Sequence, residues 1–194
     1  IAKPDRGQVL VGGQNVNKLS YRQLRKLRLN VGMLFQSAAL FDSMTVFENV
    51  GFSLMENYLL KGKELQNKVA ELLEMVEMQG YEDRMPSELS GGQRKRIGLA
   101  RAISTNPKVM LYDEPTTGLD PVLSTNIEDL IVKLNKQLKI TSIIVSHQQS
   151  TILRTADKIY MMQGGKLLPF ETPKSIMKSK DPVIKHFMSG GIVN

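Results

Sequence analysis

Hydrophobic residues along the chain follow two patterns. Short continuous apolar runs at 31–35 and 109–112 predict buried strands, because such strands are covered on both faces. The β-branched stretch 141–146 predicts the next strand. Apolar residues spaced three and four positions apart predict two amphipathic helices. Their apolar faces consist of Leu65, Val69, Leu72, Leu73 and Val76 in the first helix and Leu123, Ile127, Leu130, Ile131, Leu134 and Leu138 in the second. Strands that alternate with helices favour a parallel α/β sheet.

Polar residues mark the ends of the predicted elements. Capping boxes, in which serine or threonine is followed three residues later by glutamate or glutamine, predict helix starts. They are Ser20 with Gln23, Thr45 with Glu48, and Ser90 with Gln93. Asp120 before Pro121 predicts another helix start, and Gly80 predicts the end of the helix that precedes it.

Turn residues predict the smaller elements near both ends of the sequence. Glycines flank a short predicted strand at 8–11, and the pair Gly164-Gly165 predicts a hairpin over 157–168. Thr172 and Asp181, each followed by proline, predict two short helices. The stretch from 37 to 90 interrupts the alternation of strands and helices, and we therefore predict that it forms a helical insert.

Composition limits the classes of protein that the sequence allows. The chain has 194 residues with 41% hydrophobic and 23% charged residues, which is ordinary for a globular domain. It has no cysteine, and therefore neither a disulfide framework nor a thiolate metal site. No apolar run approaches the length of about 20 residues that a membrane-spanning helix needs. The formal net charge of +7 suits an anionic partner such as a nucleotide or a membrane surface.

Two adjacent carboxylates, Asp113 and Glu114, end the apolar run at 109–112. Ligands of open parallel sheets bind at the carboxyl ends of the strands. Paired carboxylates repel each other there unless a cation is bound, and Mg²⁺ with a phosphate is the natural occupant. The alternative for this motif alone is a helix-capping acid beside a surface glutamate.

Two glycines, Gly91 and Gly92, stand in the first turn of the helix that Ser90 and Gln93 are predicted to cap. Glycine is a poor helix former, but it leaves main-chain N–H groups open to an anion. The basic run 94–96 lies near the positive end of the helix dipole, and a bound anion would offset that conflict. The alternative is a glycine loop beside a solvated basic face.

These motifs together resemble those of the ATP-binding cassette (ABC) ATPases. Leu89–Gln93 is similar to the signature motif, and Val109–Glu114 is similar to the Walker B strand with its adjoining glutamate. Gly118–Asp120 resembles the D-loop, Ser146-His147 the switch histidine, and Phe35-Gln36 the Q-loop. The motifs occur in the family's order and span essentially the whole chain.

The resemblance implies a fold and a set of roles. The implied fold is a P-loop NTPase-like (RecA-like) parallel α/β core, formed by residues 1–36 and 91–194, with an inserted helical subdomain at 37–90. Glu114 and His147 would be catalytic, and Asp113 and Gln36 would bind Mg²⁺. The residues expected to bind ATP are Gln36, Ser90, Gly91, Gly92, Gln93 and Asp120. Gln148 departs from the pattern, since many relatives have aspartate after the switch histidine.

The family's phosphate loop, G-x-x-x-x-G-K-[ST], does not occur in the sequence. In the family it precedes the position of Ile1, as does the aromatic residue that stacks on adenine. We therefore expect a truncated cassette whose phosphate-loop unit lies upstream. The 194 residues alone are expected not to hydrolyse ATP, whereas the complete protein is expected to do so.

A further resemblance concerns the cargo. Phe35–Val50 is similar to the Q-loop stretch of the lipid-transport ATPases that work with Mce-domain proteins, including the maintenance-of-lipid-asymmetry (Mla) system. Asp181–Gly190 is similar to the C-terminal segment of that group. This resemblance implies ATP-driven transport of phospholipid or a related lipid.

The expected partners follow from the same resemblance. They are transmembrane permease subunits, a second copy arranged head to tail, and an Mce-domain protein, at the cytoplasmic face of the inner membrane. Phe41–Leu54 is expected to contact the permease. No nucleic-acid partner is expected, because the aromatic-and-basic pattern of such modules is missing. Two alternatives remain open: a non-transport ABC ATPase of ribosomes or DNA repair, and a cassette that is inactive by itself.

Overall fold

A three-stranded parallel sheet forms the centre of the computed structural model, which describes residues 4–57 and 59–190. The strands are β3 (Val31–Leu34), β4 (Val109–Asp113) and β5 (Thr141–Val145), in the order β3-β4-β5. Their register pairs Val31 with Val109 and Val109 with Thr141. The carboxyl ends of the strands therefore meet at one edge, and the predicted parallel α/β sheet is confirmed.

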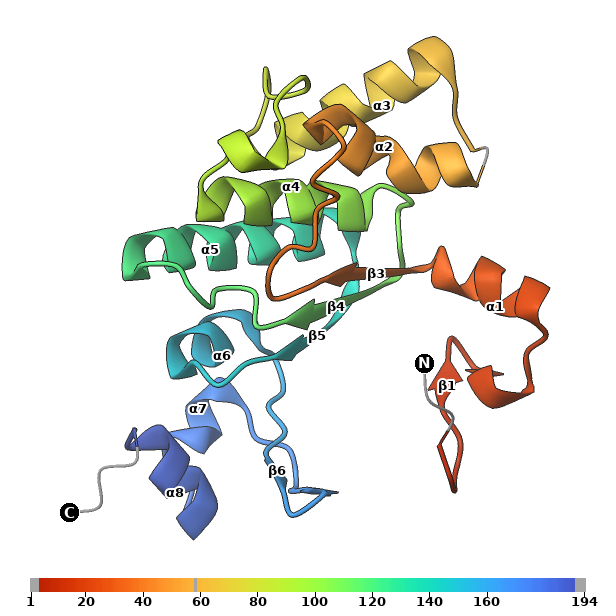
Figure 1. The fold of residues 1–194 in the computed structure, drawn as a ribbon. Coiled ribbons are helices and arrows are strands. Elements are labelled where there is room, and N and C mark those ends of the chain that lie inside the picture. The colour runs from red at the N-terminus through yellow and green to blue at the C-terminus, as the bar shows by residue number, and fades with distance from the viewer. Residues whose placement is uncertain (1–3, 58, 191–194) are drawn as a thin grey trace.

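Helices stack in two layers on one face of the sheet, as Figure 1 shows. In the first layer, α4 (Gly91–Ile103) contacts β3, and α5 (Pro121–Leu138) packs beside α4. In the second layer, α2 (Val46–Glu56) and α3 (Gly62–Met75) contact α4. The short 3-10 helix Pro86–Glu88 leads into α4. Because α4 contacts both the sheet and the second layer of helices, one hydrophobic core runs continuously from the sheet to α3.

Helix α4 approaches the sheet closely at Gly32 in β3. A Cβ atom at this position would lie 2.3 Å from the main-chain oxygen of Ala102 and 2.3 Å from the Sδ of Met110. No side chain fits into that space. The distance between β3 and the end of α4 therefore depends on glycine at this position.

The N-terminal part of the described chain lies at one side of the molecule (Figure 1). A small antiparallel hairpin, β1 (Leu10–Val11) and β2 (Gln14–Asn15), is followed by the 3-10 helix Val16–Lys18 and by α1 (Tyr21–Arg28). The predicted strand at 8–11 is thus shorter than expected. Ser20 caps α1 with the predicted capping box, since its side chain accepts from Gln23 N and the Gln23 side chain accepts in return.

The C-terminal part forms a second, smaller hydrophobic cluster around Ile159, Ile176 and Ile184. Its elements are α6 (Gln149–Thr155), β6 (Met162–Gln163), β7 (Lys166–Leu167), α7 (Pro173–Ile176) and α8 (Pro182–Met188). The predicted hairpin over 157–168 and the two short helices are confirmed. No helix in the described part of the chain is long and apolar enough to cross a bilayer.

Two elements differ from the sequence prediction. The helix α6 was not predicted, because it is short and its N-cap residue, Gln148, makes no side-chain cap hydrogen bond. It is stabilised instead by contact with α5. The helix α3 ends at Met75 rather than at Gly80, because Glu77 has a left-handed backbone with φ of 59°. Residues 37–90 contain helices and no strand among their described residues, but the division into subdomains stays a prediction.

Candidate active site

The predicted catalytic residues lie at the carboxyl edge of the sheet. β3 leads into Gln36, β4 ends at Asp113 and continues to Glu114, and β5 leads into His147. Glu114 has a left-handed backbone, with φ of 46°, and its main-chain N–H donates to the oxygen of Val145 at 2.9 Å. This turn brings the Glu114 side chain to the residues that follow β5.

Donors from two loops surround the Glu114 carboxylate. Oε1 accepts a hydrogen bond from the main-chain N–H of His147 at 3.0 Å and lies 2.7 Å from the Nδ1 of its ring. Oε2 accepts from the hydroxyl of Thr117 at 3.0 Å and from that of Ser146 at 3.3 Å. The carboxylate is therefore fixed in position by the loops that follow β4 and β5.

The electrostatics of this pair keep the Glu114 carboxylate ionised. Burial acts to raise the pKa of Glu114, but hydrogen bonds from His147 and Thr117 outweigh it and hold the pKa below its ordinary value. The Glu114 side chain is 16% exposed, whereas the His147 side chain is 69% exposed. An ionised carboxylate beside an accessible imidazole can accept a proton from a water nucleophile. The chemistry therefore fits the predicted catalytic roles.

Lys95, in the second turn of α4, ties together the loops that follow β3 and β4. Its Nζ donates to the main-chain oxygen of Gln36 at 2.5 Å and to that of Glu114 at 3.2 Å. Lys95 is only 4% exposed. Burial lowers the pKa of Lys95, while attraction to Asp113 and Glu114 opposes that change. The helix α4 thereby sets the spacing between the backbones of Gln36 and Glu114.

The loop after Gln36 has a strained backbone. Ala38 and Ala39 both have left-handed φ, at 62° and 47°, a conformation that costs on the order of 1 kcal/mol or more for each such residue. The guanidinium of Arg101 donates to the main-chain oxygens of both residues at 2.7 Å. It also lies 5.7 Å from the ring centroid of Phe41. Arg101 therefore holds the loop in this conformation from the last turn of α4.

Asn49 in α2 fixes the next part of the same loop. Its side chain is fully buried. Oδ1 accepts from the N–H of Phe41 at 2.8 Å, and Nδ2 donates to the main-chain oxygens of Phe41, Met44 and Thr45 at 3.0 to 3.1 Å. One amide thus bonds four main-chain polar groups in the turn before α2.

Ser90 is the N-cap of α4, as predicted. Its Oγ accepts from the N–H of Gln93 at 3.3 Å, and Gln93 Oε1 accepts from the N–H of Ser90 at 2.8 Å. Gln93 also donates to the hydroxyl of Tyr81 at 3.0 Å. Ser90 itself is exposed at the start of the helix, so its hydroxyl is available to a ligand.

Gly91 and Gly92 are not explained by the fold of this chain alone. Neither has a left-handed φ. A Cβ at Gly91 would lie 3.4 Å from Leu119, and one at Gly92 would lie 3.7 Å from Leu123, both ordinary contact distances. Side chains at these positions would fit within the chain. The glycines are therefore consistent with the close approach of something outside it.

A bound anion that offsets the unfavourable place of the basic run in the helix dipole stays a prediction, but the alternative of a solvated basic face is wrong. The cations have protein partners: Arg94 donates to the oxygen of Leu89 at 2.6 Å, and Arg96 pairs with Glu77 at 2.8 Å. Lys95 is buried against the main-chain oxygens of Gln36 and Glu114, which stabilise its charge near the start of the helix.

Asp120 is the N-cap of α5. Its Oδ1 accepts from the N–H groups of Val122 and Leu123, each at 2.9 Å. This confirms the predicted helix start. A contact between Asp120 and a nucleotide stays a prediction.

The residues at the carboxyl edge fit a bound magnesium ion. Asp113 offers a carboxylate and Gln36 an amide oxygen, and the Lys95 bridge places their loops side by side. Among the described residues no group of three or more acidic, histidine or cysteine side chains could hold a metal. Mg²⁺ usually takes only one or two carboxylates and completes its shell with phosphate and water, so this sparse donor set is sufficient.

Residues 1–117 match the family model described as ABC transporter. The match covers more than half of the 194 residues. The chain belongs to the ABC transporter family. The cassettes of this family bind and hydrolyse ATP, and the predicted assignment to the ABC-type ATPases is therefore confirmed.

Two curated relatives illustrate the range within the family. The chain is 40% identical over 187 residues to the intermembrane phospholipid transport system ATP-binding protein MlaF of Haemophilus influenzae, covering 96% of this chain and 71% of the relative. It is 38% identical over 189 residues to the methionine import ATP-binding protein MetN of Geobacillus kaustophilus, covering 97% of this chain but only 55% of that relative. Family membership alone therefore leaves the cargo open.

A solved ABC structure has the same fold. It is a dimeric ATP-binding cassette in a post-hydrolysis state with ADP and phosphate, 31% identical in sequence with a TM-score of 0.78. The superposition covers 89% of this chain and 75% of that one. The predicted P-loop NTPase-like fold class is confirmed by this likeness.

Sequence reasoning missed several residues that build this cassette's site. Arg101 and Asn49 carry no motif, because their partners are main-chain atoms distant in sequence. Lys95 was noticed only as part of a basic run. The run of small residues Ser37–Ala39 between the Q-loop and Leu40 was a usable signal, since small side chains allow a backbone to approach a neighbouring helix closely.

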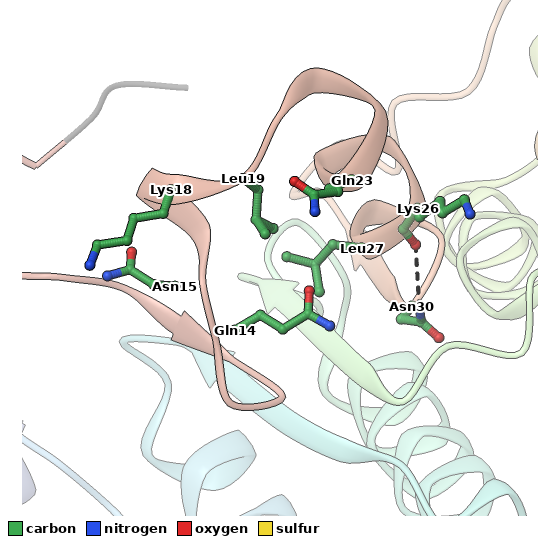
Figure 2. A pocket seen from close by; sticks show the side chains of 8 residues that line it. All are labelled: Gln14, Asn15, Lys18, Leu19, Gln23, Lys26, Leu27 and Asn30. Carbon is green, nitrogen blue, oxygen red and sulfur yellow. Dashed lines mark hydrogen bonds between the residues drawn. The ribbon is translucent and has the colours of Figure 1, made fainter.

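One open hollow of about 540 Å³ lies away from these residues, between the β1–β2 hairpin and α1 (Figure 2). Its lining is Gln14, Asn15, Lys18, Leu19, Gln23, Lys26, Leu27 and Asn30. None of the predicted catalytic or nucleotide-binding residues lines it.

Proposed function

We propose that the complete protein containing this chain is the ATP-hydrolysing subunit of a transporter for phospholipid or a related lipid. The observation that carries the ATPase part is the Glu114–His147 pair, in which an ionised carboxylate lies 2.7 Å from an exposed imidazole. The 40% identity to a phospholipid-transport relative supports lipid as the cargo.

Each residue at the carboxyl edge has a distinct role in this proposal. Glu114 is the general base that accepts a proton from the attacking water. His147 contacts the γ-phosphate, and its ring stays oriented by the bond to Glu114. Asp113 and Gln36 hold Mg²⁺, which neutralises charge on the β- and γ-phosphates when it is bound.

The working unit in this proposal is a head-to-tail dimer. Ser90, Gly91 and Gly92 offer an exposed hydroxyl and an N-terminal helix turn without obstructing side chains, which is a suitable anion site. In a head-to-tail arrangement this turn would contact the ATP held by the second copy. The solved dimeric relative with ADP and phosphate supports such an assembly.

A groove beside the Q-loop is suited to a helix of the permease. It has a volume of about 300 Å³ and is lined by residues of α1, β3, the Q-loop, α2 and α4. Phe35 and Phe41 are 42% and 41% exposed there, and Phe41 packs on Phe52 at 4.7 Å between ring centroids. Exposed aromatic side chains are typical anchors for a partner helix. We place the protein at the cytoplasmic face of the inner membrane, with a permease and an Mce-domain protein as partners.

The cargo is tested by transport in reconstituted vesicles. The complete protein, assembled with its own permease, is supplied with ATP and with either labelled phospholipid or labelled methionine. ATP-dependent phospholipid transfer supports the proposal. Methionine uptake without lipid transfer would contradict the proposed lipid cargo and favour methionine, the cargo named for the second relative. Phosphate release that needs no permease and moves neither compound would favour a non-transport ABC ATPase.

The catalytic assignment predicts the effect of Glu114→Gln. The amide keeps the size of the side chain but cannot accept the proton, so ATP hydrolysis should slow by at least about 10²-fold while ATP binding persists. Phosphate release and nucleotide binding are measured on the complete protein. Hydrolysis at the parent rate would show that Glu114 is not the base.

A further inference from the structure

A chain of buried polar groups lies behind the active site. Thr116 and Thr151 are fully buried, and Glu128 is 2% exposed. The Thr116 hydroxyl lies 2.9 Å from both Gln148 Oε1 and Thr151 Oγ1. Thr151 in turn donates to Glu128 Oε1 at 2.7 Å. We call Thr116, Gln148, Thr151 and Glu128 the Thr116 network.

The Thr116 network joins the two loops that carry the catalytic pair. Thr116 lies two positions after Glu114, and Gln148 directly follows His147. The other members anchor these loops to helices, because Thr151 belongs to α6 and Glu128 to α5. The loops are thus connected twice, once through the catalytic side chains and once through this buried network.

A gain in folding free energy does not explain why the Glu128 carboxylate is buried. The cation nearest to Glu128 is Arg154, at 3.9 Å, and Arg154 makes its short bonds of 2.8 and 2.9 Å to Asp129 instead. A buried carboxylate with so few donors costs free energy that an apolar residue of similar size would not. The burial of Glu128 is more simply explained by the Thr151 hydroxyl, which its carboxylate holds in position.

We infer that Thr116 and Thr151, anchored to α5 through Glu128, are positioning residues for ATP hydrolysis. The Glu128 carboxylate orients the Thr151 hydroxyl, which meets Thr116, and Thr116 fixes the turn after Glu114 relative to His147. Gln148 is the second attachment of that turn. This inference rests on the proposed roles of Glu114 and His147.

The network acts on the geometry of the reacting groups and not on ATP binding. Removal of one hydroxyl frees the turn after Glu114 to shift, and a misplacement of about 1 Å can lower a rate by about 10²-fold. We therefore expect the loss to appear in kcat, with KM for ATP unchanged.

Steady-state ATP hydrolysis by the complete protein, assembled with its permease, tests the inference. The variants are Thr116→Val, Thr151→Val, their double variant, and Thr151→Ser, which keeps the hydroxyl. Thr155→Val is the matched control, because Thr155 lies one turn further along α6 and donates only to the main-chain oxygen of Thr151. Thermal unfolding is recorded for every variant.

Each valine variant is expected to lower kcat by about 10-fold or more at unchanged KM. The double variant should be no slower than Thr116→Val, since that single substitution already removes the bonds of the turn to both Gln148 and Thr151. Thr151→Ser and Thr155→Val should keep kcat near the parent value. Parent kcat in both valine variants, or an equal loss in Thr155→Val, would overturn the inference.

Two further variants keep the result decisive. Gln148 is partly exposed, so Gln148→Ala is expected to fold even if a buried valine variant does not. It should also lower kcat, and parent kcat in this variant contradicts the network. Glu114→Gln is measured in parallel, because parent activity in that variant would reject the proposed catalytic base and not the network itself.

Discussion

Tyr112 shows how a single polar atom can be accommodated in a buried strand. The side chain is 1% exposed, and its hydroxyl donates to Asn135 Oδ1 at 3.1 Å. The same oxygen accepts from Ser142 at 2.8 Å. Burial raises the pKa of Tyr112 to about 12, against a smaller opposing effect of Ser142. A tyrosine in the Walker B strand is therefore tolerated because α5 supplies an acceptor.

We predict that Tyr112→Phe changes how stability depends on alkaline pH. The raised pKa favours the protonated phenol in the folded state, so its contribution is complete below the unfolded pKa of about 10 and is lost as pH rises toward 12. At pH 8 the variant should be less stable by about 1 kcal/mol, the value of one hydrogen bond. Urea unfolding of the complete protein at pH 8 and pH 11 measures this difference, which should shrink at pH 11. An equal difference at both pH values would contradict the assignment.

The Q-loop and α4 behave as one unit at the scale of elements. Arg101 bonds to Ala38 and Ala39, and Lys95 bonds to Gln36, so two turns of α4 hold the loop. A Cβ at Gly98, between them, would lie 3.1 Å from the Cβ of Ala38. Because helix and loop are in such close contact, rotation of α4 would carry the loop with it.

The exposed aromatic residue on this unit leads to a prediction about coupling. Phe41 is 41% exposed in the groove, whereas Phe47 packs partly buried against the main core. Of Phe41 and Phe47 in the predicted permease-contacting stretch, Phe41 is thus the better test. Phe41→Glu should abolish lipid transfer while basal ATP hydrolysis persists, since a charge in the groove opposes docking of an apolar helix.

Phospholipid transfer and phosphate release are measured side by side for this variant. Tyr21→Glu is the control, because Tyr21 is a 78% exposed aromatic residue on α1 that does not line the groove. Normal transfer with Phe41→Glu would remove this groove from the path of coupling.

At the scale of the whole molecule, the chain presents two kinds of site residue on different elements. The carboxyl edge of the sheet carries Asp113, Glu114 and His147, while the start of α4 carries Ser90 as an exposed cap. A Cβ at Gly91 would lie 3.4 Å from Leu119, which places that cap beside the turn that leads to α5. A head-to-tail dimer would bring the Ser90 turn of each copy to the ATP held at the carboxyl edge of the other copy.

Mixed dimers test this arrangement. One copy carries Ser90→Arg and the other Glu114→Gln, with different affinity tags so that only mixed complexes are purified. If Ser90 acts on the partner's ATP, both lesions fall in one site and the other site is intact, so hydrolysis should persist. Both homodimers should be inactive. A mixed complex as inactive as the homodimers would mean that each lesion acts within its own chain.

The sequence by itself determined the elements and the chemistry at their ends. Continuous apolar runs predicted β3 and β4 because buried parallel strands need them. A β-branched stretch predicted β5, whose residues Ile143 and Val145 are nevertheless exposed. The capping boxes predicted the starts of α1, α2 and α4, because they satisfy main-chain N–H groups within one turn. The carboxylates at the end of β4 indicated the reactive edge, since strand ends meet there.

Only the tertiary structure decided which side chains act together. Arg101 with Ala38, and Glu128 with Thr151, are paired by packing of elements far apart in sequence, and no local pattern encodes such a pair. The helix α6 likewise lacks a local start signal and forms against α5. Local hydrogen bonds and periodicity are written in neighbouring residues, whereas burial and the close approach of helix and loop exist only after the chain has folded.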